Sequence, residues 1–195
     1  ANDQVFPDIE HTQCIIAVGS NPLISKMSSI SVPKPMEKLA AIEERGGKVY
    51  WLNPRFTESA KRFGEHVAIR PDTDVFFMLG FLHEVIARGA VQQQRVADFM
   101  RGYATLIEVS QPWTPERVAE VTQISASQLR AMVDCYLAAD GAAIYSSTGV
   151  NQSRHGLLVY WLQEAINAIT GNLDKRGGVL AGRGVFPKFD PPTLL

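Results

Sequence analysis

The sequence has 195 residues, of which 46% are hydrophobic and 20% charged, with a formal net charge of -1. The length suits one α/β domain, and the composition excludes long disordered segments and fibrous repeats. The apolar runs are far shorter than the ~20 residues of a membrane-spanning helix. Near-neutrality gives no overall field to attract nucleic acid or anionic lipid. We therefore expect no nucleic-acid partner and no membrane span.

The first part of the chain alternates strand and helix patterns. A short apolar run at 13–18 is typical of a strand buried on both faces, and the segments at 48–52 and 66–70 are predicted to be the second and third strands. A helix is expected to begin at Pro35 and to end before Gly46. We also expect a short helix between the second and third strands. This alternation predicts parallel pairing with right-handed crossovers.

The rest of the chain is predicted to be mainly helical. The 73–88 segment is apolar nearly all round, so its helix should be buried on most sides or packed against another domain. Irregular chain is expected to follow a weaker helix at 92–100. Further helices are predicted from Thr114 and, with a capping box, from Ser125. A fourth strand at 141–145 and a helix at 157–169 complete an α/β fold of three αβα layers around a mostly parallel sheet.

Two residue types that often mark sites carry little signal here. Cys14 and Cys135 lie far apart, in a predicted strand and a predicted helix, and we interpret them as buried thiols rather than a metal pair or a readable disulfide. The four histidines are scattered and lack the spacing of metal ligands, so they are interpreted as structural.

Ligands of open parallel sheets collect beyond the carboxyl ends of the strands, so the loops there are the predicted site. The first of these loops offers Gly19, Ser20 and Asn21, neutral groups that suit a phosphate or a ribose. The alternative is a simple turn in which Asn21 satisfies its own backbone. After the second strand, Asn53 could contact a ribose and Arg55 a phosphate; alternatively, Arg55 pairs with an acid.

The later loops add acidic and neutral groups. Asp72 and Asp74 flank Thr73 at a helix start, where capping is the default role of a carboxylate. Only one of them is needed for a cap, and the other could accept hydrogen bonds from the N1 and N2 edge of guanine. Thr148, Gly149 and Gln152 form a further loop of neutral donors. The glycine fingerprint of nicotinamide-dependent dehydrogenases, the Walker motif and the serine-hydrolase elbow are all absent from the sequence.

In chain order, these loops resemble a known family. The sequence resembles the third domain of the molybdopterin-guanine-dinucleotide oxidoreductases of the dimethyl sulfoxide reductase and formate dehydrogenase group. Four blocks carry the resemblance: 19–22, 49–60, 69–74, and 148–152 together with 170–173. The helical stretch that begins at 114 also matches. The match runs from about residue 12 to residue 184.

The resemblance implies a Rossmann-like dinucleotide-binding domain over 1–172, with 173–195 as an extended tail toward an absent neighbouring domain. It assigns the predicted site residues to parts of the cofactor. Gly19, Ser20 and Asn21 would contact the nucleotide, Asn53, Pro54 and Arg55 its ribose and phosphates, and Asp74, beside Asp72, the guanine. Gly149 and Gln152, with Thr148 in the same loop, would face the pyrophosphate and pterin, and Arg183 would lie near the metal.

The resemblance also implies what the chain lacks. The cofactor would be molybdopterin guanine dinucleotide, two copies of which hold molybdenum or tungsten in the full-length enzyme. Any iron-sulfur cluster would lie in an absent upstream domain, and the metal-ligating residue also lies outside this sequence. We therefore expect a fragment that does not turn over alone. Its partners would be the other domains of the parent enzyme and an electron-transfer subunit, in the bacterial cytoplasm or periplasm.

Three departures from the family pattern support an alternative function. The family's Asp is Asn53 here, its Gly is Asp72, and a frequent His is Ser153. Asn53 loses a charge that favours ribose hydroxyls, and Asp72 enters positive φ less cheaply than glycine. The alternative is a non-catalytic Rossmann-like scaffold or assembly subunit that kept the fold.

Overall fold

A parallel sheet of four strands forms the centre of the molecule. The computed structural model describes residues 5–27 and 32–182. In the sheet the strand order is β4-β3-β2-β5, with bounds β2 (Cys14–Val18), β3 (Lys48–Asn53), β4 (Glu65–Ala68) and β5 (Ala142–Ser146). Ile16 pairs with Tyr50 on one side and with Ile144 on the other. Every residue of β2 is buried, as its continuous apolar run predicts.

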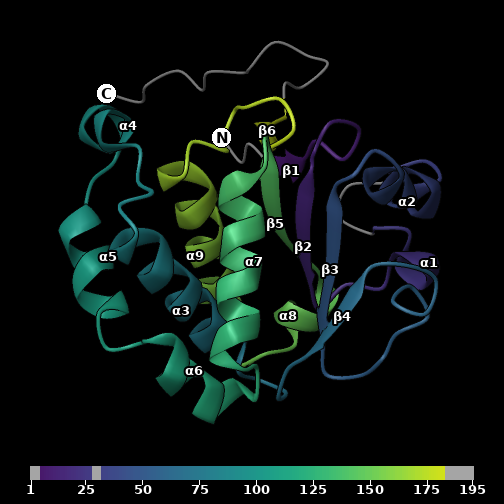
Figure 1. Cartoon of the computed structure of the whole chain (residues 1–195), viewed down its shortest axis with the longest axis horizontal. Helices are drawn as coiled ribbons and strands as arrows, with labels where there is room; N and C mark the ends of the chain where they lie inside the picture. Colours follow the sequence, from purple (N-terminus) through teal and green to yellow (C-terminus); the bar gives the residue numbers. More distant parts are fainter. Residues whose placement is uncertain (1–4, 28–31, 183–195) are drawn as a thin grey trace, which may run out of the picture.

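Helices cover both faces of this sheet (Figure 1). The larger layer contains α3 (Asp74–Ala87), α4 (Gln93–Phe99), α5 (Tyr103–Ser110), α6 (Pro115–Thr122), α7 (Ala126–Ala138) and α9 (Gly156–Ile169). On the other face lie α1 (Pro22–Ser25) and α2 (Pro35–Glu44), whereas α8 (Thr148–Asn151) lies at the carboxyl end of β5. Alternate residues of β2 enter the two hydrophobic clusters, Ile16 on the α3 side and Ile15 on the α2 side. The three-layer α/β prediction is confirmed.

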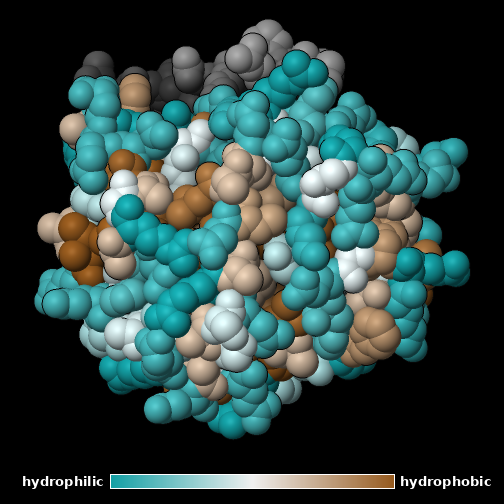
Figure 2. Space-filling view, viewed as in Figure 1, coloured by the Kyte–Doolittle hydropathy of each residue, from teal (hydrophilic) through white to brown (hydrophobic). Residues whose placement is uncertain are grey.

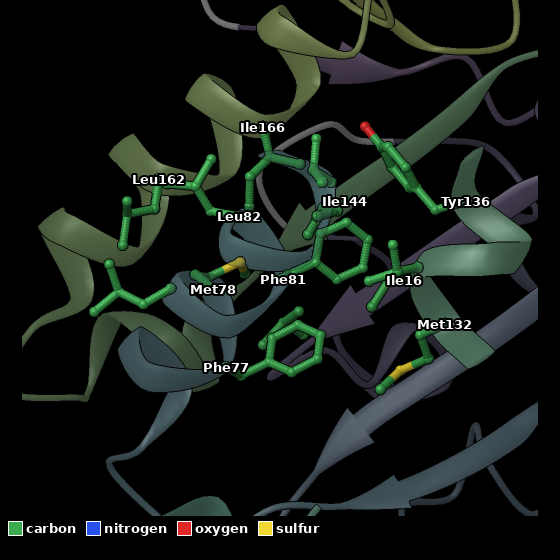
Figure 3. Packing of buried hydrophobic residues seen from close by; sticks show 14 of the residues in the cluster. Ile16, Phe77, Met78, Phe81, Leu82, Met132, Tyr136, Ile144, Leu162 and Ile166 are labelled. Atoms are coloured by element: carbon green, nitrogen blue, oxygen red, sulfur yellow. The ribbon is translucent and has the colours of Figure 1, made fainter. Parts of the chain in front are cut away.

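The helix α3 lies at the centre of the larger layer, as its all-round apolar pattern predicts. Phe77 and Phe81 are fully buried, and Figure 3 shows them between the strand residue Ile16 and the α9 residues Leu162 and Ile166. The ring of Phe81 meets that of Tyr136 edge-on, with centroids 5.3 Å apart. Such contacts fix the position of α3, and therefore of the loop that precedes it.

Side chains of α9 and of the segment directly after it attach this helix to β5. The fully buried Asn167 accepts a hydrogen bond from the backbone N–H of Ile144 at 3.2 Å and donates to its carbonyl at 3.4 Å. Asn172 accepts from the N–H of Ala142 at 3.1 Å, and the Tyr160 hydroxyl donates to the carbonyl of Ser146 at 3.0 Å. These bonds hold α9 along the whole of β5.

Two predictions of local structure are wrong. No helix forms between β3 and β4: residues 54–64 form turns, partly because Trp51 donates its indole N–H to the Phe63 carbonyl at 2.7 Å. The irregular chain expected after 92–100 instead contains α5, which follows Gly102 at φ 80. Its pattern is weak because Ile107 and Val109 remain partly exposed. In Figure 2 this face of the molecule is mostly hydrophilic, with an apolar patch over α5.

A small antiparallel sheet of β1 (Val5–Pro7) and β6 (Val179–Ala181) was not predicted. It pairs residues from near the two ends of the chain, and strands of three residues give no readable period. Thus part of the 173–195 segment pairs with β1, while the domain boundary at 172 stays a prediction. Arg183 lies outside the described residues. Among the helices of the described part, none combines the length and the apolarity that a membrane span needs.

Candidate functional site

A pocket of about 250 Å³ opens where the strands of the large sheet end. It lies between the loops that follow β2, β3, β4 and β5, as expected for a parallel sheet. Its lining consists of Gly19, Asn53, Pro54, Pro71, Asp72, Asp74, Gly149, Gln152 and Ser153. All of these except Pro71 and Ser153 are site residues predicted from the sequence. The predicted residues Ser20, Asn21, Arg55 and Thr148 lie outside this lining.

Two glycines bring the loops after β2 and β5 into direct contact. Gly19 has φ 59, and a Cβ added to it would lie 2.7 Å from the backbone N of Val150. A Cβ on Gly149 would lie 2.7 Å from the carbonyl oxygen of Gly19, which accepts a 3.0 Å hydrogen bond from the Gly149 N–H. Both positions therefore require glycine for the loop contact itself, whatever the pocket binds.

Asn53 connects the first two loops. Its side chain is buried, and its Nδ2 donates to the backbone carbonyl of Ser20 at 3.1 Å. The carboxylate that the family pattern has here could not donate this bond. The change from Asp to Asn thus has a structural role in this chain.

Asp72 joins the loop after β4 to the segment between α8 and α9. Its backbone has φ 64, the left-handed region in which the family pattern has glycine. Asp enters that region more readily than most residues. Its Oδ1 accepts a 2.7 Å hydrogen bond from the backbone N–H of Arg154, a bond that glycine could not make.

Asp74 is the first residue of α3 and is 9% exposed. Burial raises the pKa of this carboxyl, a hydrogen bond from its own backbone N–H opposes the rise, and the neighbouring Asp72 carboxylate adds to it. Thr73 occupies the cap position, but its hydroxyl donates to the Arg70 carbonyl at 2.7 Å, and α3 has no side-chain cap. Neither aspartate is therefore the N-cap of α3, but Asp74 lies in the first turn, where the helix dipole favours a carboxylate, and it also lines the pocket.

Beside the pocket, the side chains of Asn21 and Arg55 both form hydrogen bonds with Glu58. Asn21 donates to Glu58 at 2.8 Å and accepts from the N–H and hydroxyl of Ser59 at 3.2 and 2.7 Å. Arg55 makes two hydrogen bonds to Glu58, at 3.2 and 3.0 Å, and holds the pKa of that carboxyl at about 2. Arg55 is therefore paired with an acid, as the alternative prediction from the sequence stated. Asn21 is satisfied by the loop after β3 rather than by its own backbone.

The hydroxyl groups of the site differ in their surroundings. The Ser153 Oγ lines the pocket and is buried without a hydrogen-bond partner among the described residues. Within the same ranges, the buried Ser20 Oγ also has none, and Thr148 is exposed at the start of α8. The sequence signals that could have identified the two other lining residues are positional: Ser153 directly follows Gln152, and Pro71 lies between Arg70 and Asp72.

The lining of the pocket is acidic and neutral. It combines two carboxylates with the amides of Asn53 and Gln152 and the hydroxyl of Ser153, and no Lys or Arg of the described ranges lines it. Larger hollows of about 400 and 370 Å³ lie elsewhere, the first lined by Arg45 and Lys175 and the second around β1. The pocket at the strand ends suits a neutral group with several N–H donors better than it suits a phosphate.

Comparisons with known proteins place the chain in one family. The model of the molybdopterin oxidoreductase family matches residues 1–188. Formate dehydrogenase H of Escherichia coli (strain K12) is 26% identical over 185 residues, which cover 94% of this chain and 25% of that protein. The dimethyl sulfoxide/trimethylamine N-oxide reductase of Cereibacter sphaeroides is 24% identical over 200 residues, which cover 95% of this chain and 24% of that protein.

A solved structure shares the fold. Acetylene hydratase from Pelobacter acetylenicus superposes with a TM-score of 0.80 at 22% identity, over 92% of this chain and 24% of that one. The chain thus spans about a quarter of the length of the relatives that it matches. These matches confirm the resemblance carried by the four loop blocks: the chain belongs to the molybdopterin oxidoreductase family.

Proposed function

We propose that this chain is the part of a molybdenum or tungsten oxidoreductase that holds a guanine dinucleotide form of molybdopterin, with Asp74 binding the guanine. The observation that carries this proposal is the buried Asp74 carboxylate in a pocket without a cation from the described ranges. A desolvated carboxylate is costly unless hydrogen-bond donors meet it. The proposed ligand supplies those donors.

Guanine fits this requirement better than adenine. Its N1–H and N2 amino group form two adjacent donors, which match the two oxygens of a carboxylate. Adenine has a hydrogen-bond acceptor at N1. Its partial negative charge would repel the carboxylate oxygens of Asp74, which are acceptors as well. The Ser153 hydroxyl and the Gln152 amide offer further polar groups in the same lining.

The residues beside the pocket would serve the rest of the dinucleotide. Gly19 and Gly149 expose backbone rather than side chains there. Arg55 is 62% exposed in its pair with Glu58, and such exposed pairs contribute at most about 1 kcal/mol. A cofactor phosphate could therefore replace Glu58 as the partner of Arg55.

When bound, the metal of the molybdopterin cofactor supplies two-electron or oxygen-atom transfer. This chain supplies binding and orientation through the loops at the strand ends. The catalytic residues, the iron-sulfur cluster, the remaining domains and an electron-transfer subunit belong, in this proposal, to the rest of the parent enzyme.

The test compares GDP, IDP and ADP binding to the chain by NMR titration, which measures weak affinities. GDP should bind more tightly than ADP, with IDP in between because it lacks the N2 amino group. In Asp74→Asn the preference for GDP should fall about 10- to 100-fold, the usual effect of hydrogen bonds to a charged group. The matched control is Asp98→Asn, which removes an exposed carboxylate on α4 and should change nothing.

Equal affinity for GDP and ADP, unaffected by Asp74→Asn, would contradict the guanine assignment. It would favour the alternative of a scaffold that kept the fold. If GDP binds and Asp74→Asn does not change its affinity, the guanine must bind at another part of the molecule.

A further inference from the structure

The two cysteines of the chain meet at the opposite end of the sheet from the pocket. Cys14 is the first residue of β2 and Cys135 lies on α7, 121 residues later, yet their Sγ atoms are 3.2 Å apart. Both are free thiols. The prediction of buried thiols is confirmed for Cys14, whereas Cys135 is only partly buried. The sequence did not predict that the two thiols are neighbours. A disulfide bond is about 2.05 Å long, so its formation needs an approach of about 1 Å.

The two thiols differ in exposure and in surroundings. Cys14 is fully buried, whereas Cys135 is partly exposed. The hydrogen bond with Cys14 lowers the pKa of Cys135 to about 7 against the effect of burial; the Tyr50 hydroxyl and the Lys48 ammonium group also lower it, and Glu65 opposes them. The hydrogen bond with Cys135 and burial raise the pKa of Cys14. Cys135 is therefore both the more exposed residue and the one whose thiol ionises more readily, so it is the more reactive of the two.

We propose that Cys14 and Cys135 form a reversible oxidation site, at which a peroxide converts the two thiols into a disulfide between β2 and α7. In the first step the Cys135 thiolate sulfur attacks a peroxide oxygen, and the O–O bond breaks. Cys135 becomes a sulfenic acid, and the leaving hydroxide takes up a proton to give water.

In the second step the Cys14 sulfur attacks the Cys135 sulfur. The S–O bond breaks, and the released hydroxide takes the thiol proton of Cys14 as a second water. Overall, two thiols and hydrogen peroxide give one disulfide and two waters. The order follows from exposure, because a small peroxide reaches Cys135, whereas Cys14 is covered by β2's neighbours and α7.

The test treats the chain with hydrogen peroxide and follows its intact mass. Because the sequence contains two cysteines, an internal disulfide must join them. The wild-type chain should lose the mass of two hydrogen atoms, should gain no oxygen, and should return to its starting mass with dithiothreitol. Its melting temperature should rise on oxidation, since the cross-link closes a long loop.

Variants separate the two roles. In Cys14→Ala, Cys135 should stop at the sulfenic acid and react with dimedone. In Cys135→Ala, the buried Cys14 should react much more slowly. The matched control is Ala131→Cys in the Cys135→Ala background, which places an exposed thiol one turn earlier on α7; it should oxidise without joining Cys14.

Three results would overturn the proposal. One is a wild-type chain that gains oxygen without forming the disulfide. Another is a wild-type chain that stays reduced under peroxide that oxidises free glutathione. The third is cross-linking of Ala131→Cys to Cys14 as readily as in the wild type, which would mean that chain flexibility and not the observed contact brings the sulfurs together. The first two results need no variant, so they hold even if a substitution prevents folding.

Discussion

Asp74 is a residue whose burial works against the ligand-free fold. The carboxylate at the start of α3 is desolvated and lies near that of Asp72, although the N-terminus of a helix favours negative charge. Residues held at a site for binding commonly destabilise the empty protein. Asp74 is therefore expected to have opposite effects on stability and on nucleotide binding.

Asp74→Asn should stabilise the ligand-free chain at neutral pH while it weakens GDP binding. Because burial raises the folded-state pKa of Asp74 above its ordinary value of 3.8, the folded state binds more protons than the unfolded state just above pH 3.8. The contribution of this group to stability therefore falls as pH rises through that window. Urea unfolding of both proteins at neutral pH and below pH 3.8 checks the sign.

The difference between the two proteins should shrink below pH 3.8, where the wild-type carboxyl is protonated in both states. Asp98→Asn controls for the general loss of a negative charge, since that carboxylate is exposed on α4. An Asp74→Asn protein that is less stable than the wild type at neutral pH would refute the interpretation.

At the residue scale, the sequence predicted the position of the pocket better than it predicted the contacts of each side chain. The loops at the strand ends were predictable because parallel strands end at one edge of a sheet. The partners of Arg55 and Asn21 were not, since both side chains had plausible ligands and also a nearby acid, Glu58. The positive φ of Asp72 was foreseeable only from the family pattern.

At the scale of elements, the packing of α3 depends on one small residue. A Cβ added to Gly80 would lie 2.6 Å from Cγ2 of Val118 on α6 and 3.1 Å from Cδ1 of Leu129 on α7. The absence of a side chain at this position therefore allows three helices to meet closely. Glycine normally lowers helix stability relative to alanine by about 1 kcal/mol, so here packing overrides propensity.

Gly80→Ala should lower the free energy of unfolding by about 1–3 kcal/mol, the usual cost of an overpacked core. In a Val118→Ala background the same substitution should cost much less, because the methyl group that it meets is gone. A double-mutant cycle by urea unfolding measures the difference as a coupling energy. Equal effects of Gly80→Ala in both backgrounds would show that the clash does not determine the cost.

Elements with strong local patterns were predictable, and those that depend on distant partners were not. Three strands of the large sheet, β2, β3 and β5, have apolar runs, and α7 has a capping box that the structure confirms. By contrast, β1 and β6 are three residues long and form through pairing between distant segments. Residues 54–64 form turns in place of a helix because contacts with Trp51 and Asn21 determine their course.

At the scale of the whole molecule, stability is expected to be uneven. The amides of β2 pair with β3 or β5 between two hydrophobic clusters. By contrast, β1 and β6 form a sheet of two short strands in which most residues are only partly buried. Such small peripheral units open without global unfolding.

Hydrogen exchange followed by mass spectrometry should therefore show two classes of strand. Peptides from β2 and peptides from β3 should exchange only as fast as the whole molecule unfolds. Peptides from β1 and peptides from β6 should exchange earlier. The rate for β2 should follow the unfolding free energy when urea is added, while that for β1 should change little at low urea. Equal protection of the two sheets would contradict this separation.

The attachment of α9 to β5 has a consequence for assembly. Unpaired strand edges are templates on which other chains add and aggregate. Along β5 the outward backbone groups of Ala142, Ile144 and Ser146 are already bonded to Asn172, Asn167 and Tyr160. No described side chain gives β4 a similar cover. Any strand that extends this sheet, from another domain or another molecule, must therefore add beside β4, so the sheet can grow in one direction only.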